Sequence, residues 1–442
     1  MQLHVGIDDT DSVQGGCTTY IAAQLVERLS QRGLKFIDYP NIIRLNPNVP
    51  YKTRGNAAVA LRLEIPNDTV DLVRETVLQT LENQSDLGRA GTDPAAVFLE
   101  GNPSSRVRRF SRSALWDMLS TRDALRILKG HKMTAAAYGT RIGLVGALAA
   151  VGQTLEGDHT FELIAYRRRE NYGKPRRVDE NSVIKMDRLT SPRTFNNYDF
   201  EHRRILITPH GPDPVLAGVR GESATIVRQA FRLLKIAEPI ERWVIFRTNH
   251  GTDAHLNCTP NNVSVKPNRP AVLRGIVAGM PERILGGHVF FDLRYCAGRV
   301  RCAAYEPTGK FREIAANLAP RDEVVVYGGV KRKPEGSGLT VNLEKIRINS
   351  LSEELRIENP ICPHCGKHLK SAGKGQGFRC ERCSVIVRDV KKQLVRMTRD
   401  LGLGLYLPTP KAHRHLTKPL CRYGHEKRKW NHEPPSGEWH KP

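Results

Sequence analysis

The chain has 442 residues and a formal net charge of +23, from 69 Lys and Arg against 46 Asp and Glu. This length exceeds one ordinary hydrophobic core and predicts three or four domains. The charge favours a polyanionic partner, although a basic protein kept soluble by its charge is the alternative. No basic region followed by an apolar run opens the sequence, and Ile142–Gly152, the longest weakly polar stretch, is too short to cross a bilayer.

The cysteines indicate the compartment. Four of the nine stand in paired CxxC spacing, and the other five are scattered. An odd total without a visible signal favours a reducing compartment and metal ligands over disulfides. We therefore expect a cytoplasmic protein that handles nucleic acid and does not contact a membrane.

Three carboxylates crowd into four positions directly after the first predicted strand. Leu3–Ile7 alternates apolar and polar residues like a short strand, and Asp8, Asp9 and Asp11 follow it. Like charges this close repel one another, and a bound cation would relieve the repulsion.

A helix start follows the carboxylates. Gly15 and Gly16 precede Thr18 and a helical pattern over Tyr20–Gln31. A strand, an acidic loop and a glycine-led helix start can hold Mg²⁺ and the phosphates of ATP together. An exposed acidic turn with Thr18 as N-cap is the alternative.

The rest of the first third is predicted to be α/β. Val59–Ile65 alternates like a half-buried strand, and Asp68–Asn83 has the pattern of an amphipathic helix. Lys52 and Arg54 lie in a basic loop that can reach phosphates, or they are solvated. A helix is expected around Trp116–Leu128, and the composition changes at Gly139–Gly152.

The next block alternates strands and helices in the manner of a ferredoxin-like α+β sandwich. Its predicted elements are Phe161–Tyr166, Arg204–Thr208, Val215–Val219, the helix Ala224–Lys235, and Trp243–Phe246. Arg220 and Glu222 lie in the turn before that helix. The loop Asn249–His255 holds two His and an Asp beyond a strand end, where sites often lie.

A linker is predicted over Asn261–Pro270, and an OB-fold barrel after it. Three strands, a helix and two more strands within about 80 residues is the order of this barrel. The predicted elements are Val272–Val277, His288–Leu293, Arg299–Tyr305, the helix Phe311–Leu318, Glu323–Tyr327 and Leu339–Ile348. OB domains commonly bind single-stranded or loop nucleic acid. The alternative is that this barrel only separates the domains on either side of it.

Two CxxC turns predict a structural zinc site. Cys362 and Cys365 form the first pair, and Cys380 and Cys383 form the second. Four thiolates complete a closed tetrahedral Zn²⁺ shell, which leaves no open position for a substrate. Iron in the same site, or no metal, is the alternative. The surrounding Lys and Arg suit phosphate contacts, and the last thirty residues are either an RNA-gripping extension or a disordered tail.

With these pieces in order, the chain resembles the archaeal tRNA-isoleucine 2-agmatinylcytidine synthetases, the TiaS family. The motifs that carry the resemblance span nearly the whole chain. They are Gly6–Ser12, Gly15–Tyr20, Arg44–Pro47, Pro50–Asn56, Gly146–Ala150, Glu162–Arg167, Gly218–Ser223 and Thr248–Asp253, followed by the OB and zinc-ribbon order.

The resemblance implies a kinase-like domain (1–138), a ferredoxin-like domain (139–262), an OB-fold (268–350) and a zinc ribbon with a basic C-terminal extension (358–442). It implies ligation of agmatine to the wobble cytidine of an isoleucine tRNA with a CAU anticodon. ATP would be consumed to AMP and phosphate, through a phosphorylated cytidine. The family's acidic loop corresponds to Asp8, Asp9 and Asp11, and its functional threonine to Thr18.

The residues suit that chemistry. The carbonyl oxygen on carbon 2 of cytosine is a poor leaving group until it is phosphorylated. Phosphoryl transfer relies on metal-neutralised charge and positioning, which the carboxylates and glycines supply. We expect Gly15, Gly16, Lys52, Arg54, Arg220 and Glu222 to bind the substrates. Glu222, Asp213 and Asp253 are equal candidates for the carboxylate that pairs with the guanidinium of agmatine.

Two other functions compete with this one. A non-catalytic OB-fold and zinc-ribbon protein that binds nucleic acid explains the charge and the cysteines but leaves the acidic loop without a purpose. An RNA kinase lacking the amine step explains the acidic loop as well. AMP release that depends on both agmatine and tRNA separates all three.

Overall fold

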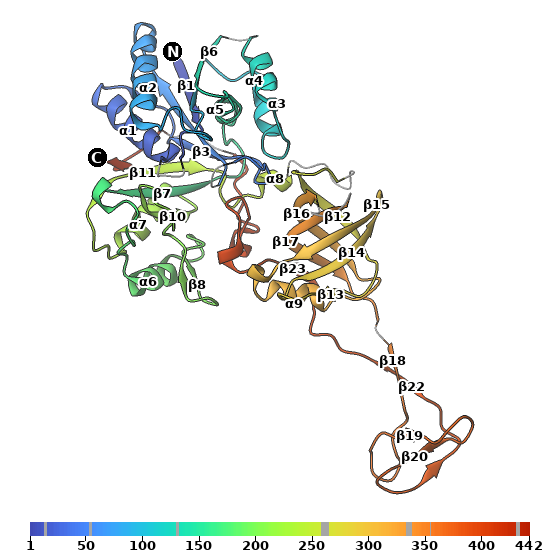
Figure 1. The fold of residues 1–442 in the computed structure, drawn as a ribbon. Coiled ribbons are helices and arrows are strands. Elements are labelled where there is room, and N and C mark those ends of the chain that lie inside the picture. The colour runs from blue at the N-terminus through green and yellow to red at the C-terminus, as the bar shows by residue number, and fades with distance from the viewer. Residues whose placement is uncertain are drawn as a thin grey trace.

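The computed structural model describes residues 1–12, 16–52, 55–129, 132–257, 265–332, 338–353, 355–429 and 434–442. Gly15, Arg54 and the first part of the predicted linker Asn261–Pro270 lie outside these ranges. Figure 1 shows a two-part body, a barrel beside it, and a small lobe at the end of a thin stalk. No helix within the described ranges is long and apolar enough to cross a membrane.

One ten-stranded sheet runs through the body, in the order β10-β7-β11-β3-β4-β1-β5-β6, with β2 beside β4 and β24 beside β11. Its first half consists of β1 (Gln2–Asp8), β2 (Lys35–Phe36), β3 (Asn41–Arg44), β4 (Ala57–Glu64), β5 (Ala95–Glu100) and β6 (Met133–Ala137). Its second half consists of β7 (Thr160–Arg167), β10 (Val215–Gly221), β11 (Ile240–Thr248) and β24 (His440–Lys441).

The two halves of the sheet join where β3 pairs with β11. This pairing is parallel, with Arg247 opposite Asn41 and Thr248 opposite Ile42, whereas the neighbouring pairs are antiparallel. A shared hydrophobic core crosses the join, because Ile164 and Phe246 of the second half pack with Ile21 and Leu25 of the first. The kinase-like and ferredoxin-like regions therefore form one continuous body.

Helices cover both faces of the first half. Helices α1 (Thr18–Gln31) and α2 (Val70–Gln84) pack on one face, and α3 (Ser105–Ser113), α4 (Thr121–Leu128) and α5 (Gly143–Gly152) pack on the other. The composition change at Gly139–Gly152 is thus a buried helix, whose small apolar residues allow close packing against β1 and β5.

The prediction of one helix around Trp116–Leu128 is wrong in its first part. Trp116 lies in a turn after α3, and α4 begins only at Thr121. Ser120 and Asp123 form a capping box at that point, which fixes a new helix start.

The second half resembles the predicted α+β sandwich. Helices α6 (Glu180–Thr190) and α7 (Ala224–Arg232) share a core with β7, β10 and β11, and a small ladder forms from β8 (Tyr198–Asp199) and β9 (Arg204–Ile205). The short helix α8 (Ala254–Asn257) follows the loop after β11.

The barrel confirms the predicted OB-fold. Its elements are β12 (Pro270–Val277), β13 (Glu282–Arg283), β14 (Val289–Tyr295), β15 (Gly298–Ala304), α9 (Phe311–Ala316), β16 (Glu323–Arg332) and β17 (Leu339–Ser350). The order β12-β16-β17-β15-β14 closes through a pairing of β12 with β14. Phe291 fills the core, while Phe290 and Tyr305 lie outside it and contact each other.

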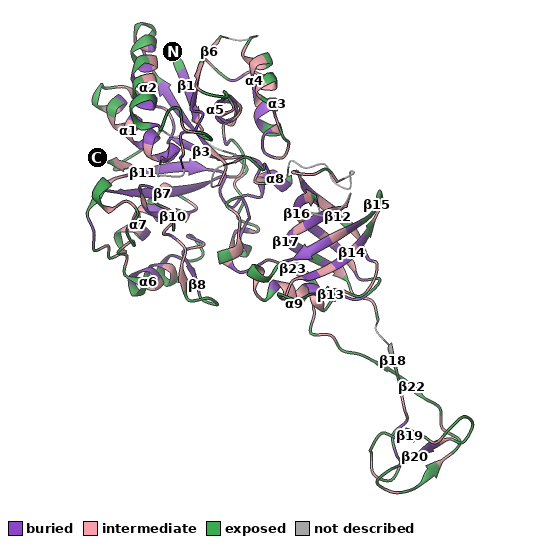
Figure 2. Ribbon diagram, in the orientation of Figure 1, coloured by how far each residue is buried: buried purple, intermediate pink, exposed green. Residues whose placement is uncertain are grey.

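The zinc ribbon stands apart on a two-stranded stalk of β18 (Leu355–Glu358) and β22 (Gln393–Arg396). Its own sheet is small, made of β19 (Lys370–Ser371), β20 (Phe378–Arg379) and β21 (Ile386–Val387). Figure 2 shows that the ribbon is mostly exposed, whereas the sheet of the body is mostly buried.

The chain returns from the ribbon to the body. Strand β23 (Gly404–Tyr406) pairs with β17, and β24 pairs with β11. We call residues 407–442 the C-terminal tail; in Figure 1 its red ribbon runs between the barrel and the body. Its described residues are folded against the body, so the alternative of a disordered tail is wrong for them, whereas the alternative of an RNA-gripping extension stays a prediction.

Candidate catalytic cavity

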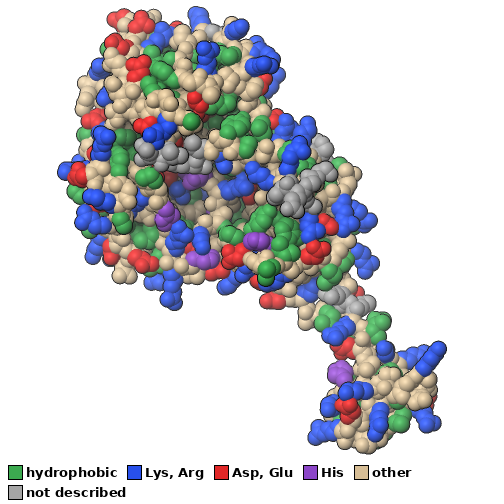
Figure 3. All heavy atoms as spheres, in the orientation of Figure 1, with side chains coloured by type: hydrophobic (Ala, Val, Ile, Leu, Met, Phe, Trp, Pro, Cys, Tyr) green, Lys and Arg blue, Asp and Glu red, His purple; other side chains and the backbone are tan. Residues whose placement is uncertain are grey.

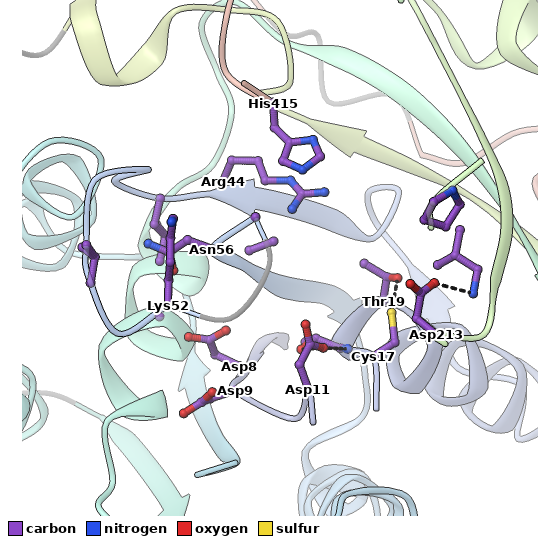
Figure 4. A pocket seen from close by; sticks show the side chains of 18 of the residues that line it. Asp8, Asp9, Asp11, Cys17, Thr19, Arg44, Lys52, Asn56, Asp213 and His415 are labelled. Atoms are coloured by element: carbon purple, nitrogen blue, oxygen red, sulfur yellow. Dashed lines mark hydrogen bonds between the residues drawn. The ribbon is translucent and has the colours of Figure 1, made fainter. Parts of the chain in front are cut away.

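A cavity of about 470 Å³ opens at one end of the strands of the shared sheet, where strands from both halves end side by side. Asp8 ends β1, Arg44 ends β3, and Arg220 lies near the end of β10. Strands β3 and β11 run parallel, and the pairs on either side of them run antiparallel. The C-terminal ends of β1, β3 and β10 therefore lie on the same side of the sheet. Figure 4 shows the cavity with the acidic loop on one side and Arg44 and His415 on the other.

Asp8, Asp9 and Asp11 all line the cavity, as expected for an acidic loop that binds a ligand. The carboxyl group of Asp8 lies against the first turn of α5, where a side chain on Gly146 would come within 1.8 Å of its Oδ2. Burial, and then the charge of Asp9, raise the pKa of Asp8 well above its usual value. Burial, and then Asp93, raise the pKa of Asp9 to about 6.

These raised pKa values support the expectation that a cation belongs here, because a cation would lower them. Carboxylate oxygens and the hydroxyl of Thr18 are the donors that Mg²⁺ prefers. Within the described residues, the ligand atoms of these aspartates do not converge into a preformed metal cluster. The donor set fits magnesium, with room for water and phosphate oxygens in its shell.

Thr18 is the first residue of α1 and is not its N-cap. Cys17 occupies the cap position and makes no capping hydrogen bond with its side chain. The backbone N–H of Thr18 donates to Asp11 Oδ1 at 2.9 Å, and its hydroxyl accepts from Thr10 at 2.9 Å and lies 3.3 Å from the same Asp11 oxygen. The alternative of Thr18 as an N-cap is therefore wrong.

Cationic side chains also line the cavity, and Arg44 lies opposite the acidic loop in Figure 4. Arg44 is half-buried, and its desolvation lowers its pKa to about 10, so it stays charged at neutral pH. Lys52 and Arg220 also line the cavity, and Arg220 donates to Glu162 at 2.9 Å. Burial alone would raise the pKa of Glu162, but Arg220 and His250 hold it well below its usual value.

Some of the residues predicted to bind the substrates line the cavity, and others lie elsewhere. Lys52 and Arg220 line the cavity, whereas Gly16 packs in the loop behind it, where a Cβ would come within 2.5 Å of Thr10 O. Gly15 and Arg54 lie outside the described residues. Glu222 is not part of the lining, and its carboxylate accepts from Arg422 and Lys427.

The structure separates the three candidate carboxylates for agmatine. Asp213 lines the cavity, accepts from the Val215 N–H at 3.0 Å and lies 3.4 Å from an Arg176 nitrogen. Asp253 is buried elsewhere, in contact with Lys345 and Tyr423. Like Glu222, Asp253 is engaged by cations outside this cavity.

Sequence reasoning missed Arg44, Glu162 and His415 as lining residues. Arg44 and Glu162 lie in two of the motifs that carry the family resemblance, which was the available signal. His415 comes from the C-terminal tail, and no spacing rule links it to a cavity built mainly from the first 220 residues.

The zinc site is preformed. The sulfur atoms of Cys362, Cys365, Cys380 and Cys383 all lie within 4.8 Å of one another. Gly366 and Ser384, which follow the second cysteine of each pair, have positive φ angles of 69° and 55°. Both turns thus have the backbone shape that aims two thiolates at one point, which fits a closed zinc shell. Figure 3 shows Lys and Arg spread over this lobe.

Family comparisons match the chain in the order of its domains. Models described as the TiaS TCKD domain and the TiaS FLD domain match residues 4–66 and 141–255. Models described as an OB-fold nucleic acid binding domain and the TiaS C-terminal zinc ribbon domain match residues 271–349 and 359–401.

Full-length relatives and solved structures agree. The isoleucine-tRNA 2-agmatinylcytidine synthetase TiaS of Methanosarcina mazei is 42% identical over 426 residues, which is 95% of this chain and 97% of the relative. A crystal structure of TiaS in complex with isoleucine tRNA and ATP is 41% identical, with a TM-score of 0.85 over 96% of this chain and 97% of that one. A complex of TiaS with isoleucine tRNA, AMPCPP and agmatine is 39% identical, with a TM-score of 0.82 and the same coverage.

Proposed function

The chain belongs to the TiaS family of isoleucine-tRNA 2-agmatinylcytidine synthetases, and from this premise we propose how its residues perform the reaction. It is an ATP-dependent ligase that joins agmatine to carbon 2 of the wobble cytidine of an isoleucine tRNA. One observation supports the assignment of roles: carboxylates from the first half of the body and cations from both halves line the same cavity.

The acidic loop is proposed to bind Mg²⁺ and, with it, the phosphates of ATP. Asp8, Asp9 and Asp11 supply the negative charge that holds the metal, and the Thr18 N–H at the start of α1 fixes Asp11 through a hydrogen bond of 2.9 Å. Bound magnesium would neutralise the charge of the transferring phosphoryl group. Arg44, Lys52 and Arg220 lie where they can contact phosphate oxygens from the other side.

Phosphorylation of the cytidine is proposed to precede attack by the amine. In the first step O2 of the cytosine attacks the γ-phosphorus of ATP, and the bond from that phosphorus to the ADP oxygen breaks; hydrolysis of this ADP by water then gives AMP and one phosphate. In the second step the primary amine of agmatine attacks carbon 2, the bond from carbon 2 to oxygen breaks, and phosphate leaves as the amine loses a proton. Positioned cations and Thr18 stabilise charge in both steps more than a strong base would.

Asp213 is proposed as the carboxylate that pairs with the guanidinium of agmatine. It belongs to the lining of the cavity, where Arg176 pairs with it at 3.4 Å, whereas Glu222 and Asp253 are held by Arg422 and Lys345 elsewhere. A forked pair with a guanidinium needs a planar carboxylate that borders the binding cavity, and Asp213 meets this requirement.

The division of labour follows the proposed domains. Regions 1–138 and 139–262 would bind ATP and agmatine, and regions 268–350 and 358–442 would hold the tRNA. The C-terminal tail is the exception, because it packs on the body. The four ribbon cysteines are arranged as metal ligands and not as disulfide pairs, which supports the proposed cytoplasmic location.

AMP formation tests the assignment directly. We expect AMP release from ATP only when both the isoleucine tRNA and agmatine are present, together with a mass gain on the tRNA equal to agmatine minus water. Asp213→Asn should raise the KM for agmatine and leave the KM for ATP unchanged. A non-catalytic RNA-binding protein would release no AMP, and an RNA kinase would transfer phosphate without agmatine.

A further inference from the structure

The C-terminal tail is anchored on the body by buried contacts. Arg422 is fully buried and forks onto Asp158 at 2.8 Å and onto Glu222. It also donates to the carbonyl of Gly251 at 2.6 Å. A buried cation held by two carboxylates has a fixed position, so this part of the tail is not a free RNA-binding arm.

Backbone hydrogen bonds then fix the tail against the loop that follows β11. Gly251 N–H donates to His415 O at 2.8 Å, and Asp253 N–H donates to Leu416 O at 2.8 Å. The backbone N–H of Lys418 returns a bond to Asp253 Oδ1 at 2.8 Å. These bonds set the position of His415 relative to this loop, which also carries His250.

The imidazole of His415 stacks on the imidazole of His250. Their ring centres are 4.9 Å apart and their planes differ by 16°. Burial lowers the pKa of His250 to about 4. His415 is more exposed, and desolvation of its stacked ring together with the charge of Arg44 lowers its pKa well below its usual value, so both rings are neutral at pH 7. Two neutral flat rings pack closely without charge repulsion, and His415 covers one face of His250.

The two ring nitrogens of His250 contact two residues that line the cavity, Glu162 and Arg44. His250 Nδ1 lies 2.8 Å from Glu162 Oε2, and Nε2 accepts a hydrogen bond of 2.6 Å from Arg44 Nε. The ring proton therefore belongs on Nδ1, towards Glu162, and the lone pair of Nε2 faces Arg44. A rotation of the His250 ring would break both contacts and release the guanidinium of Arg44.

We propose that His415 is a positioning residue of the catalytic cavity, which holds the His250 ring so that Arg44 faces the acidic loop. The chain thus completes its active site with a residue that follows the zinc ribbon in sequence. The contact is made by the face of the His415 ring, which stacks on His250, and the nitrogen atoms of His415 are not required. The inference rests on the proposed function, because Arg44 matters only if phosphates bind opposite it.

Point variants of the full-length chain test the proposal. His415→Ala removes the ring, His415→Phe keeps an aromatic plane, and His415→Asn keeps a smaller flat amide in case Phe does not fit. His425→Ala is the matched control, because His425 is an exposed histidine of the same tail and does not line the cavity. For each variant we would measure kcat for agmatine-dependent AMP formation, the KM for ATP, the Kd for tRNA and the Tm.

We expect His415→Ala to lower kcat at least about tenfold, the order of effect that a displaced binding group produces. The Kd for tRNA and the Tm should stay near those of His425→Ala, and Phe or Asn should restore most of the rate. The proposal is overturned if His415→Ala keeps its kcat, if the loss lies entirely in tRNA affinity, or if Phe and Asn are as inactive as Ala. An inactive wild-type chain would instead contradict the proposed function.

Discussion

At the scale of single residues, Asp9 connects the acidic loop to both activity and stability. Asp9→Asn removes one carboxylate from the proposed magnesium site, so we expect ATP turnover to fall by about 100-fold or more, the range for loss of one charge-stabilising group. The Kd for tRNA should hardly change, because the variant alters no surface cation. Full turnover in Asp9→Asn would show that magnesium binds elsewhere.

The pKa of Asp9 adds a pH dependence to this prediction. Burial, then Asp93, raise it from 3.8 to about 6, so the folded protein binds a proton that the unfolded chain releases between these values. Stability therefore falls as pH rises through this window. Without magnesium, Asp9→Asn should melt higher than the wild type at pH 7 and equally at pH 4. Thermal melts at both pH values, with and without Mg²⁺, provide the measurement.

Thr18 is the second residue whose role a substitution can define. Thr18→Ala loses hydrogen bonds with Thr10 and Asp11, which costs about 1 kcal/mol of stability. We expect it also to lose activity by orders of magnitude, because its hydroxyl lines the cavity beside the acidic loop. Thr18→Ser keeps the hydroxyl and should keep most of the rate. Comparable turnover in the Ala and Ser variants would reduce Thr18 to a structural residue.

At the scale of elements, patterns within one segment predicted the fold well. The strand at Leu3–Ile7 and the order of strands in the barrel were confirmed, although Leu3–Ile7 is buried on both faces and not on one alone. The two CxxC turns were confirmed as one cluster, because a local turn sets each pair of thiolates. The predicted helix through Trp116 failed, because a capping box at Ser120 starts a new helix and overrides the apolar spacing.

At the same scale, the exposed arginines of helix α3 are predicted to bind tRNA. Arg106, Arg109 and Arg112 are exposed along one face of α3 and have no acidic partner within the described part of the chain. The segment just after α3 lines the cavity with Ala114 and Leu119. We expect the triple Gln variant to bind tRNA more weakly and to lower the salt slope, by about 0.9 for each lost duplex phosphate contact.

A triple variant of equal charge provides the control for α3. Arg168, Arg169 and Arg188 are also exposed and lie in the second half of the body, away from the cavity lining. Their Gln variant should leave both the Kd for tRNA and its salt dependence nearly unchanged. If the two triple variants weaken binding equally, the effect is one of net charge, and α3 is not a specific contact.

At the scale of the whole molecule, the candidate site was only partly predictable. Asp8, Asp9, Asp11 and Thr18 come from one short loop, so their spacing revealed them. Arg44, Glu162 and His415 come together through the parallel pairing of β3 with β11 and through the return of the tail, and neither is encoded in a local pattern. No local pattern indicated that the strands of the two front regions join in one sheet.

This architecture predicts that the zinc ribbon can be removed without damage to the cavity. Glu358 and Gln393 are paired at the ends of β18 and β22, so a two-residue Asn-Gly turn can replace residues 359–392. We expect the shortened chain to bind ATP normally and to bind tRNA more weakly with a smaller salt slope. Zinc chelation of the intact chain should give the same pattern, because the ribbon loses its fold with its metal.

Removal of the tail should have the opposite effect. A chain that ends at Tyr406 keeps the acidic loop, the barrel and the ribbon, yet it loses β24 from β11, His415 from the cavity, and the partner of Glu222 and Asp158. Two carboxylates without their buried arginine destabilise the body, so we expect a lower Tm and loss of ATP turnover. Calorimetry, ATP titration and AMP assays on both chains provide the measurements. If the tail-less chain turns over ATP normally while the ribbon-less chain does not, then the ribbon, rather than the tail, is part of the catalytic body.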